Sequence, residues 1–284
     1  MGNSEQIRRE RALTATRQVA LAVDLDVTEA RVINDSNNTI VLLPAERLVS
    51  KVSTSTLDGR GRDALERELR LGQHLARHGA AVAPPAGPGI AGPHEYRGVT
   101  LTFWCYYENR PKPSDADAEL GEALRGFHAA LDDVVNALPS LAQKVDRAAE
   151  LLQEPSATPG LSATDRRAAA RAHRQVCELF DSLGSSTALH GEPHEGNIIW
   201  TESGPLLIDF EATCAGPLEW DLAYLPEAAL TAFPDRDNRA VVKLRAAVSF
   251  CVAAWCCAQP TRAPEVAAAA TYHLDLWRRS WLAA

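Results

Sequence analysis

The amino-acid sequence predicts an α+β protein with two lobes, a small antiparallel sheet carrying one helix and a larger, mainly helical lobe. Short β-branched runs separated by turn residues fill the N-terminal third of the chain. Beyond Pro113 the composition shifts to alanine-rich segments with helical spacing. A Gly/Pro-punctuated stretch, 189–211, gathers acids, histidines and an amide between apolar runs. We expect the lobes at 1–105 and 106–284, with a hinge at about 103–107.

The N-terminal lobe is expected to alternate strands with two helices. Leu65, Leu69 and Leu75 recur at helical spacing, and Gly79 closes that helix. A turn rich in Asn and Asp, 34–38, separates the first two strands. In order, the expected elements are a helix at 4–22, strands at 30–33, 39–43 and 47–52, a helix at 62–78 and a strand at 96–107.

The C-terminal lobe is expected to be built from helices around the polar stretch. The expected helices lie at 116–131, 141–152, 165–183, 238–258 and 264–281. The most apolar segment, 246–258, is too short to span a bilayer, so we expect it to be a buried helix.

Charge and cysteine content limit the partners and the compartment. With 29 basic and 37 acidic residues the net charge is 29 − 37 = −8. Nucleic-acid and membrane-surface binding need a basic field, so we expect neither partner and favour a neutral or cationic small molecule. The six cysteines lack paired spacing, and no signal-peptide pattern is present, so we expect a cytoplasmic protein. The sequence indicates no oligomeric state.

Three polar residues in the stretch 189–211 have the order that phosphoryl transfer requires. Glu192 is a loop acid, Asn197 follows five residues later, and Asp209 ends a short apolar run. In such a reaction one carboxylate takes or orients the acceptor hydroxyl, while an amide and a second carboxylate hold Mg²⁺ against the phosphates. The stretch therefore predicts a kinase-type site.

These ordered residues resemble the aminoglycoside phosphotransferase and choline kinase-like family, whose pattern is H-G-D-x-x-x-x-N, then I/V-D-F or D-W, then D-L-A. His190 and Gly191 match the H-G, Asn197 and Asp209 match the two metal ligands, and Asp221 matches the residue that braces the catalytic loop. The resemblance implies a bilobal protein kinase-like fold. It also implies Mg²⁺-dependent transfer of the γ-phosphoryl group from ATP, with GTP as the alternative donor. The acceptor would be a hydroxyl of an amino sugar, aminoglycoside, sugar or amino alcohol.

The most important position departs from the family pattern, because Glu192 stands where the family has Asp. An added methylene moves the carboxylate by about 1.5 Å, and a misplacement of about 1 Å can cost on the order of 10²-fold in rate. We favour Glu192 as the base, with Glu195 as a substitute. The alternative is a degenerate site, a pseudokinase that binds nucleotide with little or no transfer.

The two histidines of the stretch raise a zinc hydrolase or deaminase as a third hypothesis. His190 and His194 are four residues apart, but the intervening Gly and Pro prevent the helix that would place them on one face, and no P-C-x-x-C partner exists. We interpret His190 as a buried brace. His194, Glu195 and Glu211 are assigned to the acceptor side.

The N-terminal lobe supplies the expected nucleotide contacts. Lys51 resembles the family's strand lysine at the α/β-phosphates, Val49 shares its face and would lie near an adenine, and Glu68 would pair with Lys51 from the next helix. Taken singly, such a lysine and glutamate are usually solvated. The other expected contacts, in a glycine-free phosphate loop and in the hinge, are Ser36, Asn37, Asn38, Trp104 and Tyr106.

Overall fold

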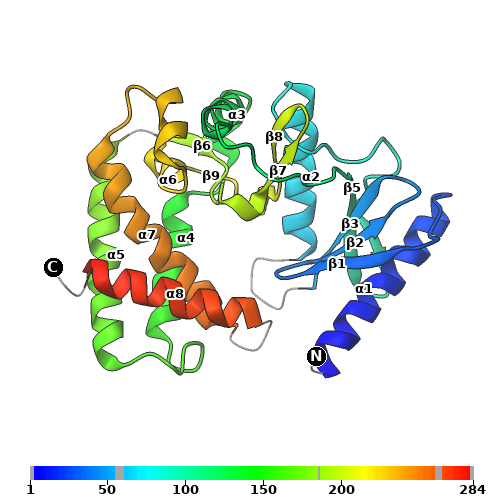
Figure 1. Ribbon diagram of the computed structural model, residues 1–284. Coiled ribbons are helices and arrows are strands. Elements are labelled where there is room, and N and C mark those ends of the chain that lie inside the picture. The colour runs from blue at the N-terminus through cyan, green and yellow to red at the C-terminus, as the bar shows by residue number, and fades with distance from the viewer. Residues whose placement is uncertain (1–2, 55–60, 185, 260–263, 282–284) are drawn as a thin grey trace. The chain divides into compact units, whose positions relative to one another are not determined.

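The computed structural model describes residues 3–54, 61–184, 186–259 and 264–281 (Figure 1). It has the mixed α+β composition that the sequence predicts. Two compact units are present, one of Met1–Ala130 with Glu195–Glu211 and one of Leu131–His194 with Ala212–Ala284. The first unit therefore extends beyond the predicted lobe boundary at 105, because helix α3 (Asp117–Ala129) packs on strand β8 (Gly204–Leu207).

A five-stranded antiparallel sheet forms the centre of the first unit, in the order β1-β2-β3-β5-β4. Its strands are β1 (Arg31–Asp35), β2 (Thr39–Leu43), β3 (Leu48–Val52), β4 (His94–Tyr96) and β5 (Val99–Cys105). The predicted single strand at 96–107 is wrong in its first part, where Tyr96 pairs with Val99 across a tight hairpin. Arg97 and Gly98 reverse the chain there with φ of 48° and 73°.

Two helices pack on the sheet, α1 (Asn3–Ala22) and α2 (Arg62–Arg77). Successive residues of a strand point to opposite faces. Ser50 of β3 meets α1, where Thr16 Oγ1 donates to Ser50 Oγ at 3.1 Å. On the other face Gly72 of α2 lies against the Trp104 ring, so close that a Cβ there would be 2.6 Å from it. Lys51, next to Ser50, is therefore directed to the α2 side.

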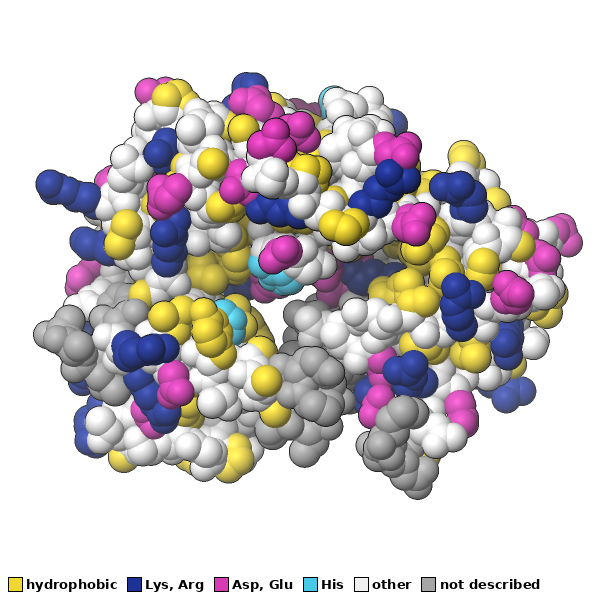
Figure 2. All heavy atoms as spheres, in the orientation of Figure 1, with side chains coloured by type: hydrophobic (Ala, Val, Ile, Leu, Met, Phe, Trp, Pro, Cys, Tyr) yellow, Lys and Arg dark blue, Asp and Glu magenta, His cyan; other side chains and the backbone are white. Residues whose placement is uncertain are grey.

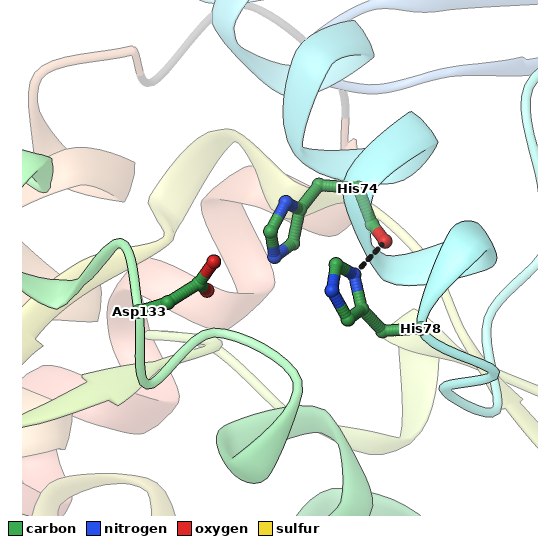
Figure 3. Close-up of side chains that lie close together, drawn as sticks. All are labelled: His74, His78 and Asp133. Carbon is green, nitrogen blue, oxygen red and sulfur yellow. Dashed lines mark hydrogen bonds between the residues drawn. The ribbon is translucent and has the colours of Figure 1, made fainter.

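The C-terminal end of α2 is fixed by its histidines (Figure 3). The ring Nδ1 of His78 lies 2.9 Å from the carbonyl oxygen of His74, and the two rings are 4.1 Å apart. His74 Nε2 lies 2.8 Å from the carbonyl oxygen of Ala130, just after α3. The His74 carbonyl oxygen also accepts from the His78 N–H at 3.1 Å, so backbone and side chain of His78 both close the end of the helix.

A second hairpin completes the first unit. The 3-10 turn η2 (Glu195–Asn197) leads into β7 (Ile198–Thr201), which pairs with β8. The hairpin brings its two ends together, and the Ile208 N–H donates to the carbonyl oxygen of Asn197 at 3.0 Å. Asn197 and Asp209, twelve positions apart in sequence, are thus held at one end of the same hairpin.

The second unit is mainly helical and is organised around one apolar core. Leu141, Val145 and Leu244 are among its fully buried members. Its elements are η1 (Val135–Ala137), α4 (Leu141–Gln153), α5 (Ala163–Leu183), β6 (Thr187–Leu189), β9 (Cys214–Gly216), α6 (Glu219–Leu222), η4 (Glu227–Ala232), α7 (Asn238–Cys257) and α8 (Pro264–Trp281). The turn η3 (Phe210–Ala212) lies where the chain passes between the units.

Helix α7 corrects one expectation about the apolar segment at 246–258. The helix begins at Asn238, so it is 20 residues long and apolar enough, by length and composition alone, to cross a membrane. Its most apolar window is 56% buried inside the protein. The expected helix is therefore present and partly buried, but the expectation that it is too short to span a bilayer was wrong, because the whole helix has 20 residues.

Charged side chains of both signs lie on the face of the molecule that Figure 2 draws. On the face drawn in Figure 2, Lys and Arg side chains alternate with Asp and Glu side chains, without one continuous basic patch. This distribution agrees with the excess of acidic residues in the sequence.

Candidate active site

Lys51 is the centre of a buried ionic cluster in the first unit. The residue is 6% exposed, and its Nζ lies 2.7 Å from Glu68 Oε1, 2.8 Å from Asp209 Oδ1 and 3.0 Å from Glu211 Oε1. Burial opposes its charged form, but the three carboxylates outweigh burial and hold the pKa of Lys51 well above its usual range. Lys51 is therefore a permanent cation.

Glu68 is the partner that the sequence predicts for Lys51, and the 2.7 Å contact confirms the pair. Its Oε1 also accepts a hydrogen bond from the Phe210 N–H at 3.0 Å, which ties α2 to the segment after β8. Among the described residues, its buried Oε2 has no hydrogen-bond partner. Burial raises the pKa of Glu68 to about 8, and the neighbouring Glu211 and Asp209 carboxylates add to that rise against the opposing effect of Lys51.

The cluster has the donor set and the charge deficit of a divalent-cation site. With all three carboxyl groups ionised, the cluster has a formal charge of 1 − 3 = −2; with Glu68 protonated, as its raised pKa favours, the charge is 1 − 2 = −1. Oxygen atoms of Glu68, Asp209 and Glu211 lie within 4.8 Å of one another. Carboxylate and amide oxygens are the ligands that Mg²⁺ prefers, so these residues and the Asn197 amide fit that ion.

Asp209 adopts a backbone conformation that few residues tolerate. Its φ is 66°, in the left-handed region, where Asn and Asp are enriched among non-glycine residues. Such conformations cost about 1–3 kcal/mol and cluster at functional sites. Here the turn aims the carboxylate at Lys51 instead of continuing the strand.

A pocket of about 460 Å³ in the first unit is lined by three members of this cluster, Lys51, Glu68 and Asp209. Val49 and Trp104, which pair across β3 and β5, give it an apolar wall on the face that carries Lys51. The predicted residues that line it are Ser36, Asn37, Asn38, Val49, Lys51, Glu68, Trp104, Tyr106, Glu195, Asn197 and Asp209. The structure thus brings eleven predicted positions from separate parts of the chain to one pocket.

The predicted phosphate loop between β1 and β2 is held by polar contacts. Asn38 is 6% exposed, and its Nδ2 donates to Glu211 Oε1 at 2.5 Å. At the start of the turn, the Asp35 carboxylate accepts from Thr39 Oγ1 at 2.7 Å and pairs with Arg8 of α1 at 2.7 Å. Side chains therefore give this glycine-free loop its shape.

In the predicted hinge, which is expected from the sequence to contact the nucleotide, two backbone N–H groups are already engaged within the protein. The Cys105 N–H donates to the Pro84 carbonyl oxygen at 3.0 Å, and the Tyr106 N–H donates to the Arg47 carbonyl oxygen at 2.8 Å. Both donors are therefore engaged inside the protein.

The loop at 190–192 in the second unit is built around Asp221. This fully buried carboxylate accepts from the His190 N–H at 2.7 Å and from the Gly191 N–H at 2.9 Å. The two hydrogen bonds confirm Asp221 as the brace of the loop. His190 is also fully buried, as its interpretation as a brace requires.

Gly191 lies where only glycine fits. Its φ is 89°, and a Cβ at this position would be 2.2 Å from the Ala212 carbonyl oxygen. Its own carbonyl oxygen accepts from Trp220 Nε1 at 2.9 Å. The backbone that presents Glu192 is thus fixed on both sides.

Glu192 has a partner that the sequence did not reveal. Lys144 Nζ of α4 lies 2.8 Å from Glu192 Oε1, and the two side chains are only 16% and 22% exposed. Burial opposes the charged form of Lys144, but the Glu192 carboxylate outweighs it and raises the pKa of that lysine. His194, two residues further on, is exposed, and its ring is 6.4 Å from the Tyr224 ring.

Comparisons with known proteins place this geometry in a family. The model of the phosphotransferase enzyme family matches residues 30–256. No curated protein matches the chain in sequence at a significant level. Solved structures resemble the chain in fold, at sequence identities of 11–15%.

Three solved structures illustrate the match. An amicoumacin kinase in complex with AMP-PNP, Ca²⁺ and Ami is 12% identical, with 99% of this chain and 96% of that chain covered and a TM-score of 0.71. A choline/ethanolamine kinase family protein from Mesorhizobium loti is 15% identical, with 94% of each chain covered and a TM-score of 0.66. A spectinomycin phosphotransferase bound to AMP is 11% identical, with 93% and 98% covered and a TM-score of 0.61.

The fold of these kinases, the family match over most of the chain and the ionic pocket agree with one another. The bilobal kinase-like architecture is therefore established, and the chain is a kinase-like phosphotransferase. The chain belongs to the phosphotransferase enzyme family.

Proposed function

We propose that this protein transfers the γ-phosphoryl group of ATP, with Mg²⁺, to a hydroxyl group of a small molecule. The observation that carries the proposal is the buried Lys51 ammonium, which contacts Glu68, Asp209 and Glu211 in a pocket with apolar walls. Such a site suits a polyphosphate with its metal, because the lysine ammonium would neutralise phosphate charge and the acidic cluster would neutralise the charge of the metal. GTP is the alternative donor.

The residues of the first unit would divide the work of nucleotide binding. Lys51, oriented by Glu68, would contact the phosphates, and Asn197 with Asp209 would hold the metal. The metal held by these residues would supply positive charge that stabilises the phosphates during transfer. The turn at 36–38 would close over the phosphates, and Val49 with Trp104 would cover the base.

The acceptor is proposed to be a hydroxyl compound that also carries a positive charge. The matched structures are named for choline, ethanolamine, amicoumacin and spectinomycin, which supports an amino sugar, aminoglycoside or amino alcohol over a neutral sugar. The net charge of −8 favours the same class. Glu192 would act on the hydroxyl, and His194 and Glu195 are the proposed acceptor contacts. Glu211, which is expected from the sequence on the acceptor side, contacts Lys51 at 3.0 Å and is proposed to act with the metal site instead.

The test is an ADP-release screen over aminoglycosides, amino sugars, sugars and amino alcohols with Mg²⁺ present. We expect turnover with at least one cationic acceptor. Asp209→Asn should lower kcat by about 10²–10³-fold, because it weakens the metal site and breaks the charge balance at Lys51. Asp235→Asn, at an exposed position outside the pocket, is the matched control.

Two results would contradict the proposal. Unchanged turnover in Asp209→Asn would remove this pocket as the site of transfer. A nucleotide-dependent rise in Tm without ADP release over the whole panel would instead favour the nucleotide-binding pseudokinase.

A further inference from the structure

We propose that Lys144 is a positioning residue that holds the Glu192 carboxylate in place for the acceptor hydroxyl. The inference rests on the proposed phosphotransfer function and adds a residue to it. Lys144 Nζ lies 2.8 Å from Glu192 Oε1, within the distance of a charge-assisted hydrogen bond. It also donates to the Gly191 carbonyl oxygen at 3.3 Å. One ammonium thus contacts both the side chain and the preceding backbone of the loop.

The backbone that carries Lys144 is rigidly placed. The first turn of α4 lies against β9, where a Cβ on Gly216 would be 2.8 Å from Leu141 Cβ. The Ala215 N–H donates to the Pro139 carbonyl oxygen at 2.8 Å, just before the helix begins. Val145, the next residue after Lys144, is fully buried in the core. The lysine therefore extends from a fixed point.

The loop on the other side of the ion pair is fixed as well. Asp221 holds the N–H groups of His190 and Gly191, and Trp220 Nε1 donates to the same Gly191 carbonyl oxygen that Lys144 contacts. With both backbones anchored, the length of the acidic side chain decides whether the pair forms.

Glutamate has the length that this geometry requires. An aspartate at 192 would withdraw the carboxylate by about 1.5 Å, so the ammonium-to-carboxylate distance would rise from 2.8 Å to about 4.3 Å on the same backbone. That separation is too long for a hydrogen bond. The glutamate that replaces the family's aspartate is therefore matched to Lys144, and the departure from the family pattern has a structural partner.

A solvated surface lysine is the plain alternative, and its surroundings argue against it. The sequence has four lysines among its 29 basic residues, and Lys144 is one of the two that are mostly buried. Among the residues that the structure describes, Glu192 is the carboxylate that pairs with its ammonium. The nearby thiols of Cys214 and Cys251 are kept protonated, because burial raises the pKa of each to about 12. Removal of Lys144 would take a cation away from a partly buried carboxylate, which is costly.

The experiment compares Lys144→Met, Lys144→Gln and Lys144→Arg with the wild type on an acceptor found in the ADP-release screen. We expect Met and Gln to lower kcat by about 10- to 100-fold, with the KM for ATP changed by less than about twofold, because Lys51 and the nucleotide pocket are untouched. Arginine keeps the charge and should restore kcat to within about tenfold of the wild type. Lys243→Met, at an exposed position on α7, is the matched control.

A double-mutant cycle separates positioning from mere stabilisation. Lys144→Met combined with Glu192→Gln should be no slower than Glu192→Gln alone, because the lysine acts only through that carboxylate. The inference would be overturned by an unchanged kcat in Lys144→Met and Lys144→Gln. It would also be overturned by a rise in the KM for ATP as large as the fall in kcat, or by losses in kcat of the two single variants that add fully in the double variant. The Arg variant reports on the role of the charge if the shorter variants do not fold.

The outcomes also distinguish this inference from the proposed function. An absence of turnover in the wild type over the whole panel contradicts the proposed function. Turnover that Asp209→Asn abolishes but Lys144→Met leaves intact contradicts only the role of Lys144.

Discussion

Replacing Asp221 with asparagine tests how the loop that carries Glu192 is held. The carboxylate of this fully buried residue accepts from His190 N at 2.7 Å and from Gly191 N at 2.9 Å, one donor for each oxygen. Asparagine keeps one acceptor oxygen and turns an NH₂ group toward the other N–H. One charge-assisted hydrogen bond is lost, and one buried donor is left facing another donor.

The magnitude follows from these two changes. A hydrogen bond to a charged group contributes about 1.5–3 kcal/mol, and a buried donor without a partner costs about 1–3 kcal/mol. We expect Asp221→Asn to lower the free energy of unfolding by about 3–4 kcal/mol, a large part of the 5–15 kcal/mol typical of a folded protein. A shift of the loop by about 1 Å would also lower kcat by about 10²-fold.

Urea denaturation followed by circular dichroism measures the first effect, and the ADP-release assay measures the second. Asp235→Asn makes the same chemical change at an exposed position and should alter the free energy of unfolding by less than about 0.5 kcal/mol. A loss in Asp221→Asn no larger than in this control would refute the idea that the loop depends on the Asp221 carboxylate.

Two further predictions concern the nucleotide pocket and the helical core. Gly72→Ala places a Cβ 2.6 Å from the Trp104 ring, so we expect a raised KM for ATP and a lowered Tm. In the control Gly126→Ala the new Cβ meets nothing within 4 Å, so this variant should stabilise α3 by about 0.5–1 kcal/mol. Equal changes in Tm for the two variants would contradict this packing. Asp165 makes paired contacts of 2.8 and 2.9 Å with Arg278, and these hydrogen bonds hold the pKa of Asp165 well below its usual range. The ionised carboxylate therefore stabilises the fold above its unfolded pKa of about 3.9, and this contribution is lost as pH falls toward the folded pKa. Asp165→Asn should lower the free energy of unfolding by about 1 kcal/mol at pH 7 and by progressively less below about pH 4. A loss that does not change with pH in urea titrations would contradict this account.

The sequence was sufficient to predict the ionic pocket because its parts follow a fixed order along the chain. Lys51 on a strand, Glu68 on the next helix and Asp209 after a short apolar run are each ambiguous alone. Their order predicts that Lys51 pairs with Glu68, and the distance of 2.7 Å confirms this pair. The contact of 2.8 Å between Lys51 and Asp209 was not predicted. The strands around Lys51 are predictable as well, because Asn, Asp and Pro mark the turns between them.

The missed features depend on contacts between segments that no local pattern records. Lys144 is one polar position in a helix, and nothing in its own neighbourhood says that its ammonium meets Glu192 forty-eight residues later. The hairpin at Arg97–Gly98 is preceded by a strand of only three residues, His94–Tyr96, which is too short and too polar to give a strand signal of its own. The engaged N–H groups of Cys105 and Tyr106 depend on where the chain at 47 and 84 passes, which local spacing does not determine.

The scarcity and burial of lysine also determine how this protein can be labelled. Of the four lysines, Lys51 and Lys144 have side chains only 8% and 16% exposed, Lys112 is 34% exposed, and Lys243 is exposed on α7. A limiting amount of an acylating dye should therefore modify the Lys243 side chain before those of the candidate site. Thiol reagents offer no such choice, since four of the six cysteines are partly accessible. Amine chemistry therefore labels positions away from Lys51 and Lys144 without any engineered residue.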